Sequence, residues 1–322
     1  MRAVVYERYG APDVLELRDV PTPTPRRREV LVEVRATSVT SADVRLRALD
    51  VPPGFGLFAR LAFGVFRPRQ RILGVELAGV VVAIGEEVRR FAVGDAVFGL
   101  TGARMGCHAE YRALPEDGAL ARIPEGLDFE QAAALPFGGT TALELLRRAN
   151  VRSGERVLVN GASGCVGAAT VQLAKHLGAH VTGVSSTANL ALLRALGADE
   201  VVDYTRGDFT GNGESYDVIV DTVGTATFSR CRRSLEDGGR LVLAAAGLPE
   251  MLAIPWVAMT TNARIIAGPV AERAEDVARL AELAAKGRLE PVIDRVYPLE
   301  HAAKAHAYVD SKRKRGSVIV RV

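Results

Sequence analysis

The spacing of apolar and polar positions changes after about residue 125. Up to that point, short runs of β-branched residues alternate with turns rich in proline and glycine, a pattern typical of β-structure. The clearest runs cover residues 3–6, 30–34, 75–84 and 96–98. This part of the chain is therefore expected to form a compact, partly open barrel.

From about residue 126 onward, strand-like apolar runs alternate with helical patterns. Such alternation predicts βαβ units and a parallel sheet, so the fold class is α/β with a doubly wound sheet. A final apolar run, 318–322, is followed by no helix and is expected to return to the first domain. The expected strands are 156–160, 180–184, 200–203, 218–221, 241–245 and 264–267, and the expected helices are 166–177, 189–196, 225–235, 272–286 and 299–309.

A glycine triplet marks the turn between the first of these strands and its helix. Gly161, Gly164 and Gly167 directly follow the strand and open the helix, which is the context that a dinucleotide-binding turn requires. Glycines let the backbone approach a pyrophosphate, and the helix N-terminus offers unpaired N–H groups. A tight turn that binds nothing is the alternative. The predicted cofactor-binding residues of this turn are Gly161, Ala162, Ser163, Gly164, Cys165, Val166 and Gly167.

The end of the second strand distinguishes the two nicotinamide cofactors. An NAD site usually places Asp or Glu there to hold the ribose 2′-hydroxyl, but no acidic residue occurs between Ala168 and Ala198. A 2′-phosphate would accept hydrogen bonds from Ser185, Ser186 and Tyr204, so NADPH is the predicted cofactor. Alternatively, the two serines cap the helix that follows.

Small residues follow two later strands at the same sheet edge. Ligands of doubly wound sheets bind beyond the carboxyl ends of the strands. Val223, Gly224, Ala246 and Gly247 are therefore predicted to leave room for the ribose and the nicotinamide.

Composition narrows the classes of partner. The chain of 322 residues is 48% hydrophobic and 25% charged, and 41 basic against 38 acidic residues give a net charge of +3. Neither nucleic acid nor a membrane is expected as a partner. Three scattered cysteines indicate no disulfide framework, and the first ten residues lack the apolar core of a signal peptide, so a cytoplasmic location is expected.

Several motifs, in order along the chain, resemble the zinc-free, quinone oxidoreductase-like branch of the medium-chain dehydrogenase/reductase superfamily. They are the segments 74–79, 94–99, 130–136, 139–143, 160–167, 181–187, 196–199 and 202–205. The resemblance implies a chaperonin-10-like (GroES-like) catalytic domain at 1–125, completed by about 290–322, and an inserted Rossmann domain at 126–289. It also implies that Gly316 and Ser317 complete the nicotinamide pocket, and that the protein forms a homodimer through the sheet edge near residues 264–268.

Two positions depart from the zinc-dependent relatives. The position of their cysteine ligand corresponds to Thr40, and the Gly-His-Glu triplet reads Gly74, Val75, Glu76. Threonine is a poor zinc ligand and valine is none, so no metal is expected. The relatives also often place Arg or Lys where this chain has Ala188.

Without a metal, hydride addition to an unactivated carbonyl is difficult, whereas a conjugated acceptor spreads the negative charge. The predicted reaction is NADPH-dependent reduction of a quinone or an α,β-unsaturated carbonyl, with Thr40 and Thr141 as candidate catalytic hydroxyls. Each threonine could instead cap a helix, with Thr141 starting one at 142–148. The alternatives for the function are an enoyl-thioester reductase and a non-catalytic NADPH-binding regulatory protein.

Overall fold

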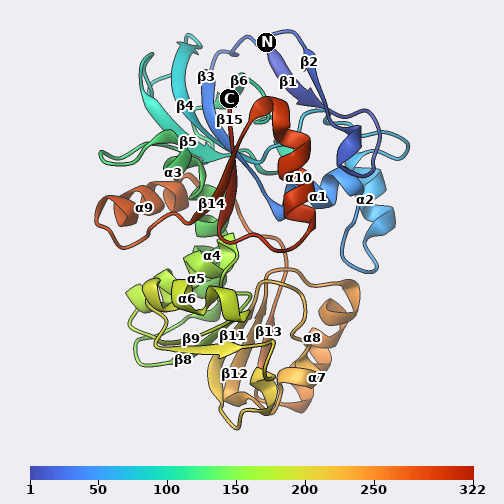
Figure 1. The fold of residues 1–322 in the computed structure, drawn as a ribbon, viewed down its shortest axis with the longest axis vertical. Helices are drawn as coiled ribbons and strands as arrows, with labels where there is room; N and C mark the ends of the chain where they lie inside the picture. The colour runs from blue at the N-terminus through green and yellow to red at the C-terminus, as the bar shows by residue number, and fades with distance from the viewer. The chain divides into compact units, whose positions relative to one another are not determined.

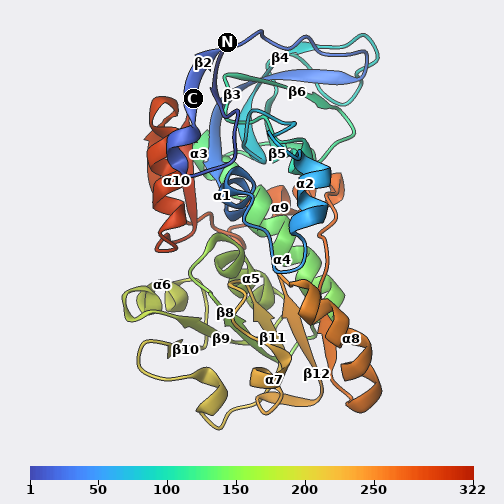
Figure 2. The same ribbon diagram turned by 90° about the vertical axis from the view of Figure 1, so that its right-hand side faces the viewer.

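The computed structural model describes residues 1–322 and divides into two compact units. The first unit comprises Met1–Val51, Gly56–Thr140 and Glu272–Val322, and the second comprises Pro52–Phe55 and Thr141–Ala271. Figures 1 and 2 show the chain as a ribbon from two sides. The domain boundaries expected from the sequence, 125/126 and 289/290, stay a prediction.

The first unit is built on a seven-stranded sheet of order β14-β15-β3-β4-β5-β7, with β6 paired to β3. The central strand β3 is 11 residues long, and its apolar side chains Val30, Val32 and Val34 are buried in the core. The last strand of the chain, β15, runs antiparallel to β3, with Val318 opposite Val39. The strands are β3 (Glu29–Val39), β4 (Glu76–Ile84), β5 (Ala96–Leu100), β6 (Tyr111–Pro115), β7 (Leu120–Arg122), β14 (Ile293–Pro298) and β15 (Ser317–Arg321), beside a separate pair, β1 (Arg2–Val5) and β2 (Glu16–Asp19).

Helices cover the first unit, and several of them lie where the sequence showed no helical pattern. The segment between Leu46 and Arg71 contains the end of one helix and all of another. The helices are α1 (Ser41–Ala48), α2 (Gly56–Phe63), α3 (Phe129–Ala133), α9 (Ala274–Ala285) and α10 (Ala302–Asp310), with short 3-10 helices at Pro12–Val14, Gly102–Arg104 and Leu299–His301. The helix α4 (Pro136–Ala149) begins in the first unit and continues into the second.

The second unit contains a six-stranded sheet of order β10-β9-β8-β11-β12-β13, and all its pairings are parallel. The strand order reverses between β8 and β11, which is the doubly wound topology with its switch point. The predicted fold class is thus confirmed. The strands are β8 (Arg156–Asn160), β9 (His180–Ser185), β10 (Glu200–Asp203), β11 (Tyr216–Asp221), β12 (Leu235–Leu243) and β13 (Arg264–Ile266).

Burial on both faces explains why these strands read as apolar runs. Val157, Leu158 and Val159 of β8, whose side chains point alternately to the two faces of the sheet, are all fully buried, so both faces are covered at β8. The helices of this unit are α5 (Cys165–His176), α6 (Leu190–Ala195), α7 (Phe228–Cys231) and α8 (Leu248–Thr260), with 3-10 helices at Thr187–Asn189 and Phe209–Gly211. The helix α8 packs against β13 (Figure 1).

Three expectations about elements of the second unit and of α4 are corrected. The helix expected at 225–235 is reduced to α7, because β12 already begins at Leu235. The helix α8 was not expected at all. Thr141 does not start a helix, since α4 begins five residues earlier, at Pro136. No helix of the structure is long and apolar enough to cross a membrane.

Candidate functional site

The turn between β8 and α5 depends on its glycines. Gly161 has a φ of +79°, a backbone conformation that favours glycine. A Cβ on Gly167 would lie 2.2 Å from the carbonyl oxygen of Gly161, so any side chain there would collide with the backbone. The conformation of one glycine and the close approach at the other explain why this turn follows the strand so tightly.

The N-terminus of α5 is left open by this turn. Its N-cap is Gly164, and no side chain caps the helix. A Cβ on Gly164 would meet only the Gly161 carbonyl oxygen, at 3.6 Å, so the space beside the N-cap is open. The N–H groups of Cys165, Val166 and Gly167 have no partner within a helix, and together with the helix dipole they favour an anion. The predicted turn residues therefore form a cradle that fits a pyrophosphate.

Three predicted serine hydroxyls meet at the end of β9. The Ser185 hydroxyl donates to the Ser163 hydroxyl at 2.8 Å. The side-chain amide of Asn189 lies 3.2 Å from the hydroxyls of Ser163, Ser185 and Ser186. Asn189 was missed from the sequence, where the only signal was a short polar residue four positions after the strand-ending Ser185. It joins the serine of the glycine turn to the serines of the second strand.

A carboxylate lies beside these serines on the neighbouring strand. Asp203 ends β10 opposite Ser185 and accepts hydrogen bonds from the hydroxyls of Thr187 and Thr205. The hydrogen bond from Thr187, followed by that from Thr205, holds the pKa of Asp203 below its ordinary value. The Arg206 guanidinium lies 3.6 Å from the same carboxylate, and its side chain is 78% exposed. Asp203 lies outside the segment 168–198, where an NAD site usually has its acidic residue, because it belongs to the next strand.

The other predicted residues of the second unit lie at the same edge of the sheet. Val223 and Gly224 follow β11, and Ala246 and Gly247 follow β12, with Gly247 as the N-cap of α8. The loop after β11 is held by Asp221, whose carboxylate accepts from the backbone N–H groups of Val223 at 3.2 Å and Ala226 at 3.0 Å. Tyr204, directly after β10, is exposed.

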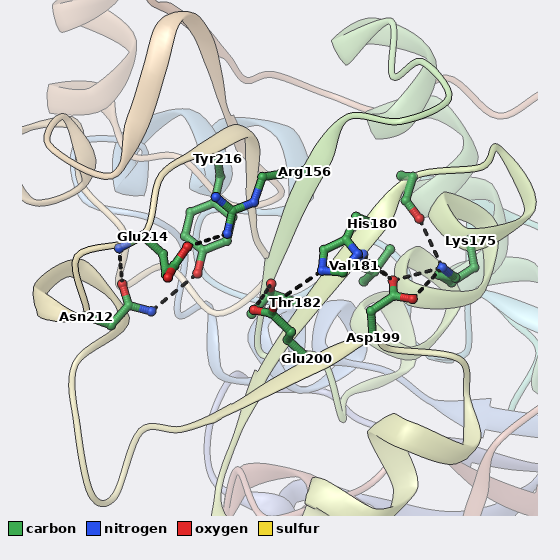
Figure 3. Close-up of polar contacts among 11 residues, drawn as sticks. Arg156, Lys175, His180, Val181, Thr182, Asp199, Glu200, Asn212, Glu214 and Tyr216 are labelled. Atoms are coloured by element: carbon green, nitrogen blue, oxygen red, sulfur yellow. Dashed lines mark hydrogen bonds and ion pairs between the residues drawn. The ribbon is translucent and has the colours of Figure 1, made fainter.

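A further group of polar contacts lies at the opposite edge of this sheet (Figure 3). Arg156, His180, Glu200 and Tyr216 begin β8, β9, β10 and β11 in turn. His180 Nε2 lies 3.2 Å from Glu200, and Arg156 pairs with Glu214 at 2.5 Å. Ligands of doubly wound sheets bind at the carboxyl ends of the strands, so these contacts tie the sheet together and are not the candidate site.

Thr40, in the first unit, is the N-cap of α1. Its hydroxyl donates to Asp43 Oδ2 at 2.6 Å and accepts from the Asp43 backbone N–H at 3.3 Å, which forms a capping box. The other carboxylate oxygen of Asp43 accepts the backbone N–H of Gly74 at 2.8 Å. Thr40 therefore has the capping role that was considered for it, and Asp43 joins the start of α1 to the segment at Gly74, just before β4.

The remaining predicted residues are the C-terminal pair and Thr141. Gly316 has a φ of +59°, and a Cβ there would lie 2.0 Å from the carbonyl oxygen of Val292. The Ser317 hydroxyl donates to the carbonyl oxygen of Ala134 at 3.2 Å, within the first unit. Thr141 lies inside α4 and is the first residue of the second unit after the division at Thr140.

The donor set near Thr40 does not fit a zinc ion. Val75 offers only hydrocarbon, and the hydroxyl of Thr40 is already bonded to Asp43. No three His, Cys, Asp or Glu side chains gather into a group that could hold a metal.

Comparison with known proteins gives matches along nearly the whole chain. Residues 26–125 match the family described as "Alcohol dehydrogenase GroES-like domain", and residues 196–320 match that described as "Zinc-binding dehydrogenase". The chain is 33% identical to a quinone oxidoreductase of Sus scrofa, over 99% of this chain and 97% of that protein. It is 31% identical to an NADPH-dependent alkenal/one oxidoreductase of Arabidopsis thaliana, over 99% of this chain and 79% of that protein. The structure of the quinone oxidoreductase from Coxiella burnetii matches with a TM-score of 0.88 and 30% identity, over 100% of this chain and 99% of that one.

Proposed function

Because this chain belongs to the quinone oxidoreductase-like branch of the medium-chain dehydrogenase/reductase superfamily, an oxidoreductase family, we propose that it reduces quinones or α,β-unsaturated carbonyls with NADPH and without zinc. The relatives named for quinones and for alkenals or enones support both acceptor classes. Both are conjugated carbonyl compounds, which accept hydride without a metal more readily than simple ketones do.

The observation that carries this proposal is the open N-terminus of α5 behind the Gly161–Gly167 turn. Its unpaired N–H groups and the space at Gly164 suit the pyrophosphate of a dinucleotide. NADPH, when bound, supplies the hydride. The contribution of the chain is to hold the cofactor at the carboxyl edge of the sheet, with Val223, Gly224, Ala246 and Gly247 as the small residues along that edge.

The preference for NADPH is proposed to rest on the hydroxyls and the amide at the end of β9. Ser186 and Asn189 present donors that suit a 2′-phosphate, and the exposed Tyr204 adds a phenol. The buried Ser185 donates its single hydroxyl hydrogen to Ser163 and would have to turn from it to reach the phosphate. Asp203 opposes the phosphate charge, and Arg206 compensates for it. Arg206 thereby provides near β10 the cation that Ala188 does not provide after β9.

The chain's part in the reaction is proposed to be positioning, with hydrogen bonds to the acceptor oxygen. Thr40 and Thr141 are the proposed donors. Because the single hydroxyl hydrogen of Thr40 already points to Asp43, it would have to turn from that carboxylate to the acceptor. Gly316 and Ser317 are proposed to complete the nicotinamide pocket. Thr40 is a poor ligand for the zinc named in one matched family description, and Val75 is none, so the proposed reaction uses no metal.

We also propose that the protein is a homodimer formed through β13 and α8. The strand β13 ends the sheet and pairs on one side only, with β12. Beside it, α8 exposes large apolar side chains, with Leu252 at 70%, Trp256 at 59% and Met259 at 78%. An unpaired strand edge next to an exposed apolar surface is a typical place for association.

The test is the oxidation of NADPH, and separately of NADH, in the presence of quinones, enones, simple aldehydes and an enoyl thioester. Faster turnover of the quinones or enones with NADPH than with NADH supports the proposal. Turnover of the thioester alone favours an enoyl-thioester reductase. Binding of NADPH without turnover of any acceptor favours a non-catalytic regulatory protein.

A further inference from the structure

Glu76 is a buried carboxylate, at 1% exposure, that joins two segments far apart in the sequence. Its Oε1 accepts a hydrogen bond from the hydroxyl of Ser38, near the end of β3. Its Oε2 accepts the backbone N–H of Phe137 at 2.6 Å, in the first turn of α4. One side chain of β4 thus holds the end of a strand and the start of a helix.

These two segments lead to the two candidate hydroxyls. Ser38 stands two residues before Thr40, and Phe137 stands four residues, about one helical turn, before Thr141. The first N–H groups of α4 need partners, and a carboxylate there also interacts favourably with the helix dipole. A shift of Glu76 would therefore move the supports of both Thr40 and Thr141.

We propose that Glu76 is a positioning residue whose ionised carboxylate fixes the start of α4 and the end of β3, and thereby the hydroxyls of Thr141 and Thr40. This inference rests on the proposed function. It assigns to Glu76 a role in the reaction through its neighbours and not through contact with the substrate.

The charge of Glu76 is costly in this environment. Burial raises its pKa to about 7, while the hydrogen bonds from Ser38 and Phe137 act in the opposite direction. Nearby, Asp43 on α1 raises the pKa, and Lys314, before β15, lowers it. The charge of Glu76 in turn contributes to the raised pKa of the buried Cys107 thiol.

The raised pKa of Glu76 makes it possible to distinguish a role in positioning the site from a role in stabilising the fold. The stability contributed by Glu76 is complete below its unfolded pKa of about 4.5, and is lost as the pH rises through about 7. If the carboxylate only held the fold together, an uncharged replacement would serve as well or better. If the charge positions the site, such a replacement would keep stability and lose activity.

The test compares E76Q with the wild type. Glutamine has nearly the same shape, and its amide oxygen and NH₂ group can pair with the Phe137 N–H and the Ser38 hydroxyl. We expect E76Q to melt at or above the wild-type temperature at pH 8, with kcat/KM for a quinone lower by about two- to five-fold. Wild-type kcat/KM should rise with pH through about 7, a change that E76Q lacks. The affinity for NADPH should stay unchanged.

Two further variants sharpen the result. S38A removes a hydrogen bond that lowers the Glu76 pKa, so it should move the pH-dependent rise in kcat/KM to higher pH. E116Q is the matched control: Glu116 is 3% exposed and accepts the backbone N–H groups of Arg89 at 2.7 Å and Arg90 at 2.9 Å, in a loop without predicted site residues. It should leave the pH profile unchanged.

Amide hydrogen exchange of residues 137–145 provides a readout that needs no turnover. Faster exchange in E76A and in E76Q at pH 8, but not in E116Q, is expected. If E76Q had the same kcat/KM and the same exchange rates as the wild type, the inference would be overturned. If the wild-type protein reduced no acceptor, the proposed function would fail, and an unchanged exchange rate would overturn the role of Glu76 separately.

Discussion

At the scale of single residues, the structure gives each glycine of the predicted turn a local conformational reason, while cofactor binding there stays a prediction. The spacing of Gly161, Gly164 and Gly167 predicted a pyrophosphate turn, and the structure supplies a separate reason for each glycine. Gly161 needs a positive φ, Gly164 leaves open space, and Gly167 allows a close approach of the backbone.

The substitution G167A should therefore disrupt the turn. Its Cβ would lie 2.2 Å from the Gly161 carbonyl oxygen and 2.7 Å from the Ala162 Cα, and neither backbone atom can move cheaply. We expect a loss of stability of about 1–3 kcal/mol and at least a ten-fold weaker affinity for NADPH. Thermal unfolding and a fluorescence titration would measure both. G164A is the control, because its Cβ meets no clash: stability should fall by less than in G167A, by about 0.5–1 kcal/mol for the weaker N-cap.

Cofactor preference should depend on the charges beside the serines. R206A should raise KM for NADPH by about two- to five-fold and leave KM for NADH unchanged, because only NADPH carries the 2′-phosphate. D203N should act in the opposite direction by removing a like charge. The ratio of kcat/KM for the two cofactors is the measurement. Equal changes in kcat/KM for NADPH and NADH would show that neither residue interacts with the 2′-phosphate.

The buried His306 should make the protein sensitive to acid. Burial lowers its pKa well below 6.5, and His108 and Arg47 lower it further. Its Nδ1 lies 3.2 Å from Arg47 Nη1, and its Nε2 has no hydrogen-bond partner. Because the unfolded chain binds a proton that the folded protein excludes, stability should fall as the pH drops below about 6.5, by up to about 1.4 kcal/mol per pH unit.

The variant H306N keeps an acceptor for Arg47 but has no group that titrates in this range. Its unfolding free energy should therefore decrease less than that of the wild type between pH 7 and pH 5.5. Chemical denaturation at both pH values is the measurement. An identical decrease in the two proteins would assign the acid sensitivity to other groups.

At the scale of elements, the alternating pattern predicted the parallel sheet, but not every helix. The helix α8 was not predicted because Pro249 lies in its first turn and Pro255 lies inside it. Proline is unfavourable inside a helix, so this segment shows no helical pattern. The end of the expected helix 225–235 was wrong because β12 extends back to Leu235. Local propensity predicted the type of most elements, and tertiary pairing decided where they begin and end.

The exposed face of α8 and the edge of β13 lead to a prediction about assembly. In sedimentation velocity, the wild type should run as a dimer, and the double variant W256E/M259E as a monomer, because two buried charges would oppose association. L57E is the control, since Leu57 on α2 is equally exposed and apolar but lies in the first unit. A wild-type monomer would contradict the proposed interface.

At the scale of the whole molecule, the contacts that the sequence could not predict join distant parts of the chain. The last apolar run was expected to return to the first domain, but its partner strand, β3, was not predicted. The buried Arg47 of α1 forms an ion pair with Asp310 of α10 at 2.6 Å. Asp203 was missed because it lies opposite Ser185 on the next strand, and Asn189 was missed because its contact with Ser163 joins segments 26 residues apart. The two bonds of Glu76 also join segments that no local pattern relates.

The central claim is direct hydride transfer from NADPH to a conjugated acceptor without a metal. It is tested most directly with NADPH deuterated at both C4 positions, an enone acceptor and protein stripped of metal by a chelator. The account predicts one deuterium at the β-carbon of the product, formed at the same rate before and after chelation. A product without deuterium, or turnover that returns only when zinc is added, would contradict it.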